Sequence, residues 1–288
     1  MIIHQKAHMK DWTSFRVGGP ADIIAEPKDI KELVELIKFL RSQNIKFYIL
    51  GNGTNLLVSD KGVRGCVVHI GKNLSKIKVN GTKIEAEAGA SISEIAQVAL
   101  KNNLHGMEEL SGIPGTIGGA LSTNAGAYER EIKDIFSSAN AINEVGHVVK
   151  LSKDAMNFSY RNSVISEGRF IVTQVILNLQ DGDKKEIQKK MDRYKELRFK
   201  NQPLEYPSAG SIFKKPENKY AGRLIEESNL KGESIGGAEV STKHAGFIIN
   251  TGNAKAMDIY RLMERIKADV KIYHNVLLEP EIKLWGKF

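Results

Sequence analysis

The fold is decided by one stretch, Ser111-Gly112-Ile113-Pro114-Gly115-Thr116-Ile117-Gly118-Gly119-Ala120. It holds four glycines and a proline within ten residues, and Asn124-Ala125-Gly126-Ala127 follows shortly after. Such a stretch offers few side chains to a core, and glycine loses more backbone entropy on ordering than other residues do. We therefore expect an extended loop whose bare backbone contacts a large flat ligand and its phosphates. A glycine-rich connection between two small domains is the alternative.

A second glycine segment, Gly51-Asn52-Gly53-Thr54-Asn55-Leu56-Leu57, directly follows an expected buried strand at residues 47–50. Glycines at such a place allow backbone N–H groups to come close to a phosphate. The segment lacks the Gly-Lys pair of a nucleoside triphosphate loop and the spacing of the dinucleotide fingerprint. Taken alone, it favours a tight turn between strands.

The hydrophobic spacing along the chain predicts several small mixed layers. An amphipathic helix over 29–41 lies between short strands at 23–25 and 47–50, with 56–58 following, which indicates a β-α-β layer. The expected later strands are 66–70, 83–88, 135–142, 147–151, 170–179 and 246–250, and the expected later helices are 92–102 (capped by Ser91), 184–199, 221–229 and 254–271. The pattern is typical of an α+β protein.

The composition excludes several classes of protein. The 288 residues are 41% hydrophobic and 26% charged, which is ordinary for a folded chain. No apolar run approaches the roughly 20 residues of a membrane span, and the first residues lack the apolar core of a secretory signal. A single cysteine, Cys66, excludes an internal disulfide framework, and the scattered histidines give no metal-ligand spacing. We expect a cytoplasmic protein with no metal site and no membrane insertion.

The net charge is +8, and residues 184–223 carry twelve Lys or Arg against five Asp or Glu. A basic balance suits a nucleic acid or a small polyanion such as a nucleotide sugar, but it is equally typical of a solvated helix face. Single-strand binders interleave their cations with aromatic side chains, and here the interleaving is thin, with Tyr194, Phe199 and Tyr206 among the helix cations and the link after them. Charge alone leaves these alternatives open.

Three further segments carry reactive side chains. They are Phe158-Ser159-Tyr160-Arg161-Asn162-Ser163, Pro207-Ser208-Ala209-Gly210-Ser211-Ile212-Phe213-Lys214-Lys215-Pro216 and Leu278-Glu279-Pro280-Glu281-Ile282. Alone, Arg161 is typical of a surface cation, Ser211 of a turn residue and Glu281 of an exposed strand end. Ser211 does not lie in a Gly-x-Ser-x-Gly elbow and has no histidine beside it in the sequence, so hydrolase chemistry is not indicated at this serine.

Taken together, these segments resemble a known family. The two glycine segments look like the FAD-binding signature of vanillyl-alcohol-oxidase-type flavoproteins. Within that superfamily, the chain from about residue 13 to residue 284 closely resembles the UDP-N-acetylenolpyruvoylglucosamine reductase family, which acts in peptidoglycan synthesis and hence in cell-wall biogenesis. The resemblance implies an α+β vanillyl-alcohol-oxidase/PCMH-type FAD-binding fold of two subdomains, 1–70 and 71–182, followed by an α+β substrate-binding domain, 183–288.

The resemblance also implies functional residues. Those expected to contact a non-covalently bound FAD are Gly51, Asn52, Gly53, Thr54, Asn55, Leu56, Ser111, Gly112, Ile113, Pro114, Gly115, Thr116, Gly118, Gly119, Asn124, Ala125 and Gly126. The family's arginine, serine and final glutamate fall here on Arg161, Ser211 and Glu281. The implied reaction passes a hydride from NADPH through FAD N5 to the enolpyruvyl double bond of a UDP-sugar, giving UDP-N-acetylmuramate.

That chemistry gives each catalytic candidate a task. Arg161 and Glu281, the latter protonated if it donates, would stabilise the enolate-like charge, and Ser211 would donate the proton, polarised by Lys214 or a water. The substrate-binding candidates are Tyr160, Lys200, Lys214 and His244, with the diphosphate or the carboxylate expected on the two lysines. We expect a monomer that binds no nucleic acid.

Two departures from the family pattern stand out. Lys215 occupies a position where some relatives carry asparagine, and the stretch between Arg161 and Ser211 lacks the insertion that bears a lid tyrosine in one branch. The chain resembles the shorter branch. The rival hypotheses are an FAD-dependent sugar or alcohol oxidase of the same superfamily and a basic nucleic-acid-binding protein.

Overall fold

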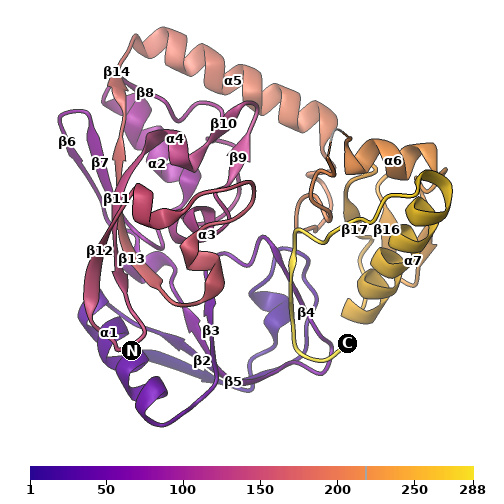
Figure 1. Cartoon of the computed structure of the whole chain (residues 1–288), viewed down its shortest axis with the longest axis horizontal. Helices are drawn as coiled ribbons and strands as arrows, with labels where there is room; N and C mark the ends of the chain where they lie inside the picture. Colours follow the sequence, from indigo (N-terminus) through magenta and orange to yellow (C-terminus); the bar gives the residue numbers. More distant parts are fainter. Residues whose placement is uncertain (218) are drawn as a thin grey trace. The chain divides into compact units, whose positions relative to one another are not determined.

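The computed structural model describes residues 1–217 and 219–288 and divides into two compact units. The first unit contains residues 1–4, 23–52 and 65–198, and the second contains residues 5–22, 53–64 and 199–288. The chain therefore passes between the units several times. Figure 1 shows the elements of each unit.

The first unit opens with a sheet in the strand order β1-β2-β5-β3. The strands are β1 (Ile2–Gln5), β2 (Ala21–Glu26), β3 (Phe47–Leu50) and β5 (Val63–His69), and β3 runs parallel to β5. Helix α1 (Ile30–Ser42) follows β2 and is capped by the Asp29 side chain, which accepts a hydrogen bond from Glu32 N. The helix buries an apolar face of Leu33, Leu36, Ile37 and Leu40, as the helical spacing predicted.

A second, antiparallel sheet of five strands forms the middle of the first unit (Figure 1). Its order is β12-β11-β13-β7-β6, with β6 (Ile77–Asn80), β7 (Lys83–Glu87), β11 (Phe136–Ile142), β12 (Val148–Ser152) and β13 (Ile171–Asn178). Helices α2 (Ile92–Lys101), α3 (Ile117–Ser122) and α4 (Ile132–Ile135) accompany it, and α2 and α3 both contact β7. Ser91 caps α2 in a capping box, so the predicted N-cap is confirmed.

Short elements complete the first unit. They are the pairs β8 (Leu104–His105) with β14 (Gln180–Asp181) and β9 (Gly126–Ala127) with β10 (Arg130–Glu131), and the 3-10 turns η2 (Lys72–Leu74), η3 (Asp154–Met156) and η4 (Val164–Glu167). Helix α5 (Lys184–Asn201) begins in this unit and buries Ile187 and Met191 along an otherwise exposed surface.

The second unit places two helices around a small sheet. Strands β15 (Ser234–Ile235), β16 (Ala238–Val240) and β17 (Ile248–Asn250) pair antiparallel, and α7 (Ala256–His274) contacts β15, β16 and α6 (Ala221–Glu227). Residues from the N-terminal part of the chain join its core, among them Phe15 and Leu57. The unit also contains the short turn η1 (Met9–Asp11).

Two expectations from the sequence need correction. Residues 117–122, expected within an extended loop, form helix α3, because Thr116 caps a helix whose side chains Ile117, Ala120 and Leu121 are buried. Residues 56–58 form the expected strand β4 (Leu56–Val58), but it pairs in parallel with β18 (Lys283–Trp285), far away in the sequence, and does not join the opening sheet.

Asp60, in the loop after β4, also binds the N-terminal end of helix α7. Both Asp60 carboxylate oxygens accept backbone N–H groups at the start of that helix, from Ala256 at 2.9 Å and Met257 at 3.0 Å. A carboxylate at this position satisfies unpaired helix donors and favours the positive end of the helix dipole. Residues about 200 positions apart are thereby joined within the second unit.

A partly buried polar cluster joins three strands of the opening sheet. The Glu26 carboxylate accepts hydrogen bonds from His4 Nε2 at 2.8 Å and His69 Nδ1 at 2.9 Å. Partial burial alone would raise the pKa of Glu26, but the two imidazole hydrogen bonds outweigh it and lower that pKa below its ordinary value.

We therefore predict a pH-dependent stability loss for Glu26→Gln. Because the pKa of the carboxyl is lower in the folded than in the unfolded chain, ionised Glu26 stabilises the fold at neutral pH. That contribution is fully present above the ordinary glutamate pKa of about 4.3 and disappears as the pH falls below it through the lowered pKa of the folded chain. Urea unfolding should show the variant less stable than the wild type at pH 7 and the difference shrinking at acid pH. Glu35→Gln, on the exposed face of α1, is the control. A difference that stays constant with pH would contradict the prediction.

Candidate active site

The structure brings the two glycine segments together in the first unit. A Cβ built on Gly51 would lie 2.5 Å from Thr116 Oγ1, so the backbone at Gly51 lies directly against the start of α3. Thr116 is buried, with 2% of its surface exposed, and its hydroxyl accepts a hydrogen bond from Gly119 N at 3.2 Å. Only glycine permits this close approach.

Some backbone groups of the glycine segment are hydrogen-bonded within the fold, and others lie at the surface. The N–H groups of Ile117 and Gly118 donate to Ala90 O at 2.8 Å and Ala88 O at 2.9 Å, so these two donors serve the fold. Gly112, Pro114 and Gly119 are exposed instead. Bare backbone on the outer side of a rigidly held loop fits a flavin, whose phosphates and ring need donors and a smooth surface.

The Gly53–Leu56 part of the first glycine segment belongs to the second unit. Gly53 has a φ of +62°, and a Cβ there would lie 2.2 Å from Trp12 O. Asn55 Nδ2 donates to Glu281 O at 3.2 Å, and Asn55 O accepts Lys283 N at 3.0 Å. One of the expected flavin-binding residues is thus hydrogen-bonded to the segment that carries Glu281.

Arg161 lies at the tip of a tight turn in the first unit. Ser159 and Asn162 exchange two backbone hydrogen bonds, 3.1 and 3.2 Å long, and Arg161 between them has a φ of +54°. A left-handed conformation is normally left to glycine or asparagine, and costs an arginine roughly 1–3 kcal/mol. Its guanidinium donates to Gly126 O at 3.4 Å and lies 5.1 Å from the ring centre of Tyr160.

Ser211 and Glu281 come together in the second unit. Ser211 forms an antiparallel bridge with Phe247, and the next residue, Ile212, accepts the N–H of Glu281 through its carbonyl at 2.7 Å. The segment of Ser211 therefore lies hydrogen-bonded to the segment of Glu281. The residue Ser211 is exposed and Glu281 is partly buried.

The substrate-binding candidates have different surroundings. Lys214 Nζ lies 3.2 Å from Glu279 Oε2, so its charge is paired with that carboxylate. Lys200 is exposed in the last turn of α5. Tyr160 is 46% exposed beside Arg161. The arrangement gives Lys214 a carboxylate partner that the sequence pattern did not identify.

His244 is held as a neutral imidazole. Burial lowers the pKa of its ring, and Nδ1 accepts the N–H of Gly246 at 3.1 Å. A neutral ring that accepts at Nδ1 carries its hydrogen on Nε2. The ring packs edge-on against Phe247, with centres 4.9 Å apart, and Phe247 is the residue that bridges to Ser211.

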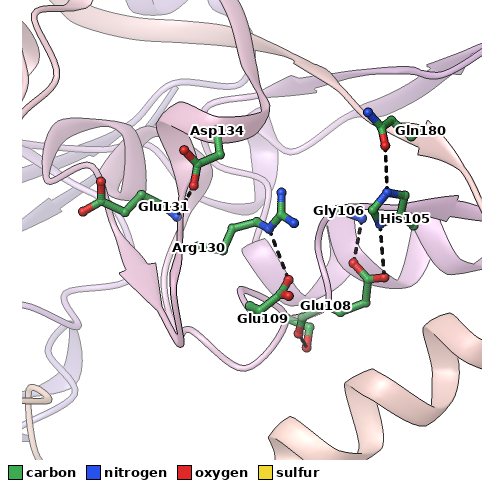
Figure 2. A network of polar contacts seen from close by, with 9 residues as sticks. His105, Gly106, Glu108, Glu109, Arg130, Glu131, Asp134 and Gln180 are labelled. Atoms are coloured by element: carbon green, nitrogen blue, oxygen red, sulfur yellow. Dashed lines mark hydrogen bonds and ion pairs between the residues drawn. The ribbon is translucent and has the colours of Figure 1, made fainter.

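A polar network that sequence reasoning missed fixes the start of the glycine segment (Figure 2). Glu108, 2% exposed, accepts Gly106 N at 2.6 Å and lies 3.7 Å from His105 Nδ1, while His105 Nε2 bonds Gln180 at 2.9 Å. The main chain of Glu108 accepts the Ser111 hydroxyl at 2.7 Å. Side chains on β8 and β14 thus determine where the glycine segment begins.

Neighbouring residues extend this network to α5. Arg130 Nε lies 3.3 Å from Glu109 Oε2, and Tyr128 stacks on Tyr194 at 4.4 Å between ring centres. One helical turn beyond Tyr194, Arg198 lies against Gly112, and burial lowers the pKa of its guanidinium, which stays charged. The sequence feature that could have predicted these contacts is the spacing of Tyr194 and Arg198, which lie four residues apart and therefore on one face of a helix.

Comparison with known proteins identifies the class of this site and then the family. Residues 21–152 match the FAD binding domain family. The fold likeness extends to a solvent-stable cholesterol oxidase, with a TM-score of 0.50 at 16% identity over 62% of this chain and 38% of that one. The chain therefore contains an FAD-binding fold, as expected, and is a flavoprotein.

Residues 202–285 match the C-terminal domain family of UDP-N-acetylenolpyruvoylglucosamine reductase. The chain is 53% identical to that reductase of Caldanaerobacter subterraneus subsp. tengcongensis and 47% identical to that of Clostridium novyi, over 97% of its length and 92% and 91% of theirs. The crystal structure of the Thermus caldophilus reductase superposes with a TM-score of 0.87 at 34% identity, covering 99% of this chain and 100% of that one. The chain belongs to the UDP-N-acetylenolpyruvoylglucosamine reductase family and is an oxidoreductase.

We predict that Gly51→Ala abolishes most FAD binding. The added methyl group would overlap Thr116 Oγ1 and displace the cap of α3, which shapes the exposed backbone at Gly119. The measurement is the ratio of flavin to protein absorbance after gel filtration.

The control for this prediction is Gly81→Ala. Gly81 has a φ of +57° and open space around its Cα, so alanine costs on the order of 1 kcal/mol of stability without a clash. It should retain FAD. Full flavin content in Gly51→Ala would show that the contact with Thr116 does not shape the site.

Proposed function

We propose that this chain reduces the enolpyruvyl double bond of UDP-N-acetylenolpyruvoylglucosamine to give UDP-N-acetylmuramate, with NADPH as the hydride donor. The family supports the substrate class. The observation that carries the assignment of roles is the hydrogen-bonded pairing of the segments of Ser211 and Glu281. A strained turn presenting Arg161 supports it further.

A bound FAD would supply hydride transfer between the nicotinamide and the alkene carbon. The residues that would hold it are the exposed backbone at Gly112, Pro114 and Gly119 and the loop from Gly51 to Leu56. Arg198, buried against Gly112, adds a positive charge beside that backbone. These groups would bind and orient the flavin. The remaining steps are carried out by the side chains of Arg161, Glu281 and Ser211.

Arg161 and Glu281 stabilise charge. Reduction at one alkene carbon leaves electron density on the other carbon and on its carboxylate. A guanidinium and a protonated carboxyl, placed at that carboxylate, stabilise the developing enolate more than the ground state. The peptide N–H of Glu281 is fixed by Ile212 O and its carbonyl by Asn55, so the carboxyl group projects from an anchored backbone.

Ser211 donates the proton that completes the reduction. Its backbone is fixed by the bridge to Phe247, and because the residue is exposed, water can return the proton after turnover. The pairing of Lys214 with Glu279 partly neutralises the cation that was expected to polarise the hydroxyl. We therefore assign the polarisation of Ser211 to a water and retain Lys214, beside Glu279, as a substrate-binding residue.

Further parts of the proposal concern organisation and location. Residues 1–70 and 71–182 would form the flavin subdomains and 183–288 the substrate domain, with Tyr160, Lys200, Lys214 and His244 contacting the substrate. We place the enzyme in the cytoplasm as a monomer that binds no nucleic acid. Within residues 1–217 and 219–288, no helix has the length and apolar character needed to cross a bilayer.

An oxidase of the same superfamily is the alternative, and the site disfavours it. An oxidase that uses oxygen has no alkene carbon to protonate, so it has no need for Ser211 beside Glu281. Fast reoxidation of the reduced protein by oxygen, with no response to the enolpyruvyl sugar, would support the oxidase. Salt-dependent binding to single-stranded DNA without flavin would support a nucleic-acid-binding protein.

We predict that Ser211→Ala separates the two half-reactions. Loss of the proton donor should slow reoxidation by the enolpyruvyl sugar on the order of 10²–10⁴-fold, while flavin reduction by NADPH stays within about twofold of the wild type. Stopped-flow absorbance of the flavin measures both. Ser208→Ala, in the same loop, is the matched control. Equal loss of both half-reactions would remove Ser211 from its role as proton donor.

Arg161→Lys should also slow the second half-reaction, on the order of 10²-fold. A lysine keeps the charge but cannot form the planar, two-point contact of a guanidinium with a carboxylate. Arg169→Lys, a neighbouring exposed arginine paired with Glu167, provides the control. Single-turnover rates at saturating substrate decide the outcome, and an unchanged rate in Arg161→Lys would show that a point charge is enough.

A further inference from the structure

Both sides of the Arg161 turn are hydrogen-bonded to one segment, residues 122–126. On one side, Asn124 Nδ2 donates to Ser159 O at 3.1 Å. On the other side, the Ser163 hydroxyl donates to Ser122 O at 3.0 Å. The Arg161 guanidinium itself donates to Gly126 O at 3.4 Å. The turn is therefore attached to the end of the glycine segment at three points.

Asn124 was expected to contact FAD, but its side chain is committed to the protein. It is fully buried, at 0% exposure. Its two amide hydrogens go to Ser159 O and to Glu131 Oε2 at 3.0 Å, and its oxygen accepts Lys133 N at 3.1 Å. An asparagine amide has two hydrogens, so no donor remains for a ligand.

Ser163 is likewise fully buried, at 0% exposure. Its hydroxyl oxygen also accepts Ile165 N at 3.3 Å and so caps the turn η4. One side chain thus ends the Arg161 turn, starts the next turn and binds the end of α3. A strained arginine keeps its conformation only when its neighbours fix it in this way.

We propose that Asn124 and Ser163 are positioning residues for Arg161. They fix the position of its guanidinium relative to residues 122–126, at the end of the glycine segment. The inference rests on the proposed function, because it assigns these side chains to the step in which Arg161 stabilises charge. Its physical basis is that a displacement of about 1 Å in a charge-stabilising group costs on the order of 10²-fold in rate. Loss of either side chain would release one side of the Arg161 turn. The glycine segment, residues 111–120, which is expected to bind FAD, would keep its conformation.

The test compares Ser163→Ala and Asn124→Asp with the wild type in both half-reactions. Asn124→Asp keeps the shape but replaces the two amide hydrogens with an oxygen that faces Ser159 O and Glu131. Reoxidation by the enolpyruvyl sugar should fall on the order of 10–100-fold, with flavin content and reduction by NADPH within about twofold of the wild type. Ser228→Ala is the matched control, because Ser228 is a buried serine that donates to Leu224 O at 2.8 Å in the second unit.

A second readout does not depend on activity. Trypsin cleaves after Arg161 only when the turn opens, so the cleavage rate follows the population of the open form. Mass spectrometry should show cleavage at this bond on the order of tenfold faster in both variants, and unchanged in Ser228→Ala.

Two results would overturn the inference. One is that both variants match the wild type in reoxidation and in cleavage. The other is that both half-reactions fall together with flavin content, which would make the two residues part of flavin retention. If the wild type itself does not reduce the enolpyruvyl sugar, the proposed function fails, while the cleavage result still decides whether these side chains hold the turn.

Discussion

The structure depends on fixing the backbone of the glycine segment, residues 111–120, in one conformation. A segment rich in glycine has few side chains with which to anchor itself, and its chain entropy opposes any fixed conformation. Here the anchoring comes from outside the segment. Ile117 and Gly118 donate to the carbonyls of Ala90 and Ala88, and the Glu108 carbonyl binds the Ser111 hydroxyl. The five-stranded sheet and the buried carboxylate network thus provide the rigidity that the glycine segment lacks.

Local patterns predicted much of the fold. The helix over residues 29–41, the cap at Ser91 and the strands around residues 136–152 follow from spacing and capping rules and are present. The parallel pairing of β4 with β18 could not be predicted, since those strands lie more than 200 residues apart and neither carries a signal that names its partner. Helix α3 was missed because glycine content argued against a helix, while burial of Ile117 and Leu121 overrode that propensity.

The candidate site was predictable by residue type but not by environment. Motif resemblance singled out Arg161, Ser211 and Glu281, and the roles assigned to them stay proposals. The left-handed backbone of Arg161, the pairing of Lys214 with Glu279 and the buried amide of Asn124 depend on neighbours from other segments. Such contacts decide whether a polar side chain faces a ligand or the protein, and a sequence motif does not contain them.

The pairing of β4 with β18 determines the order in which the two units can form during synthesis. All residues of the first unit have been synthesised once position 198 is reached, so that unit can assemble while the rest of the chain is still being made. The second unit also uses residues 5–22 and 53–64, and within it strand β4 has no pairing strand until residues 283–285 have been synthesised. Until then Leu57, which lies on β4 and in the core of the second unit, lacks part of the core that buries it in the finished fold.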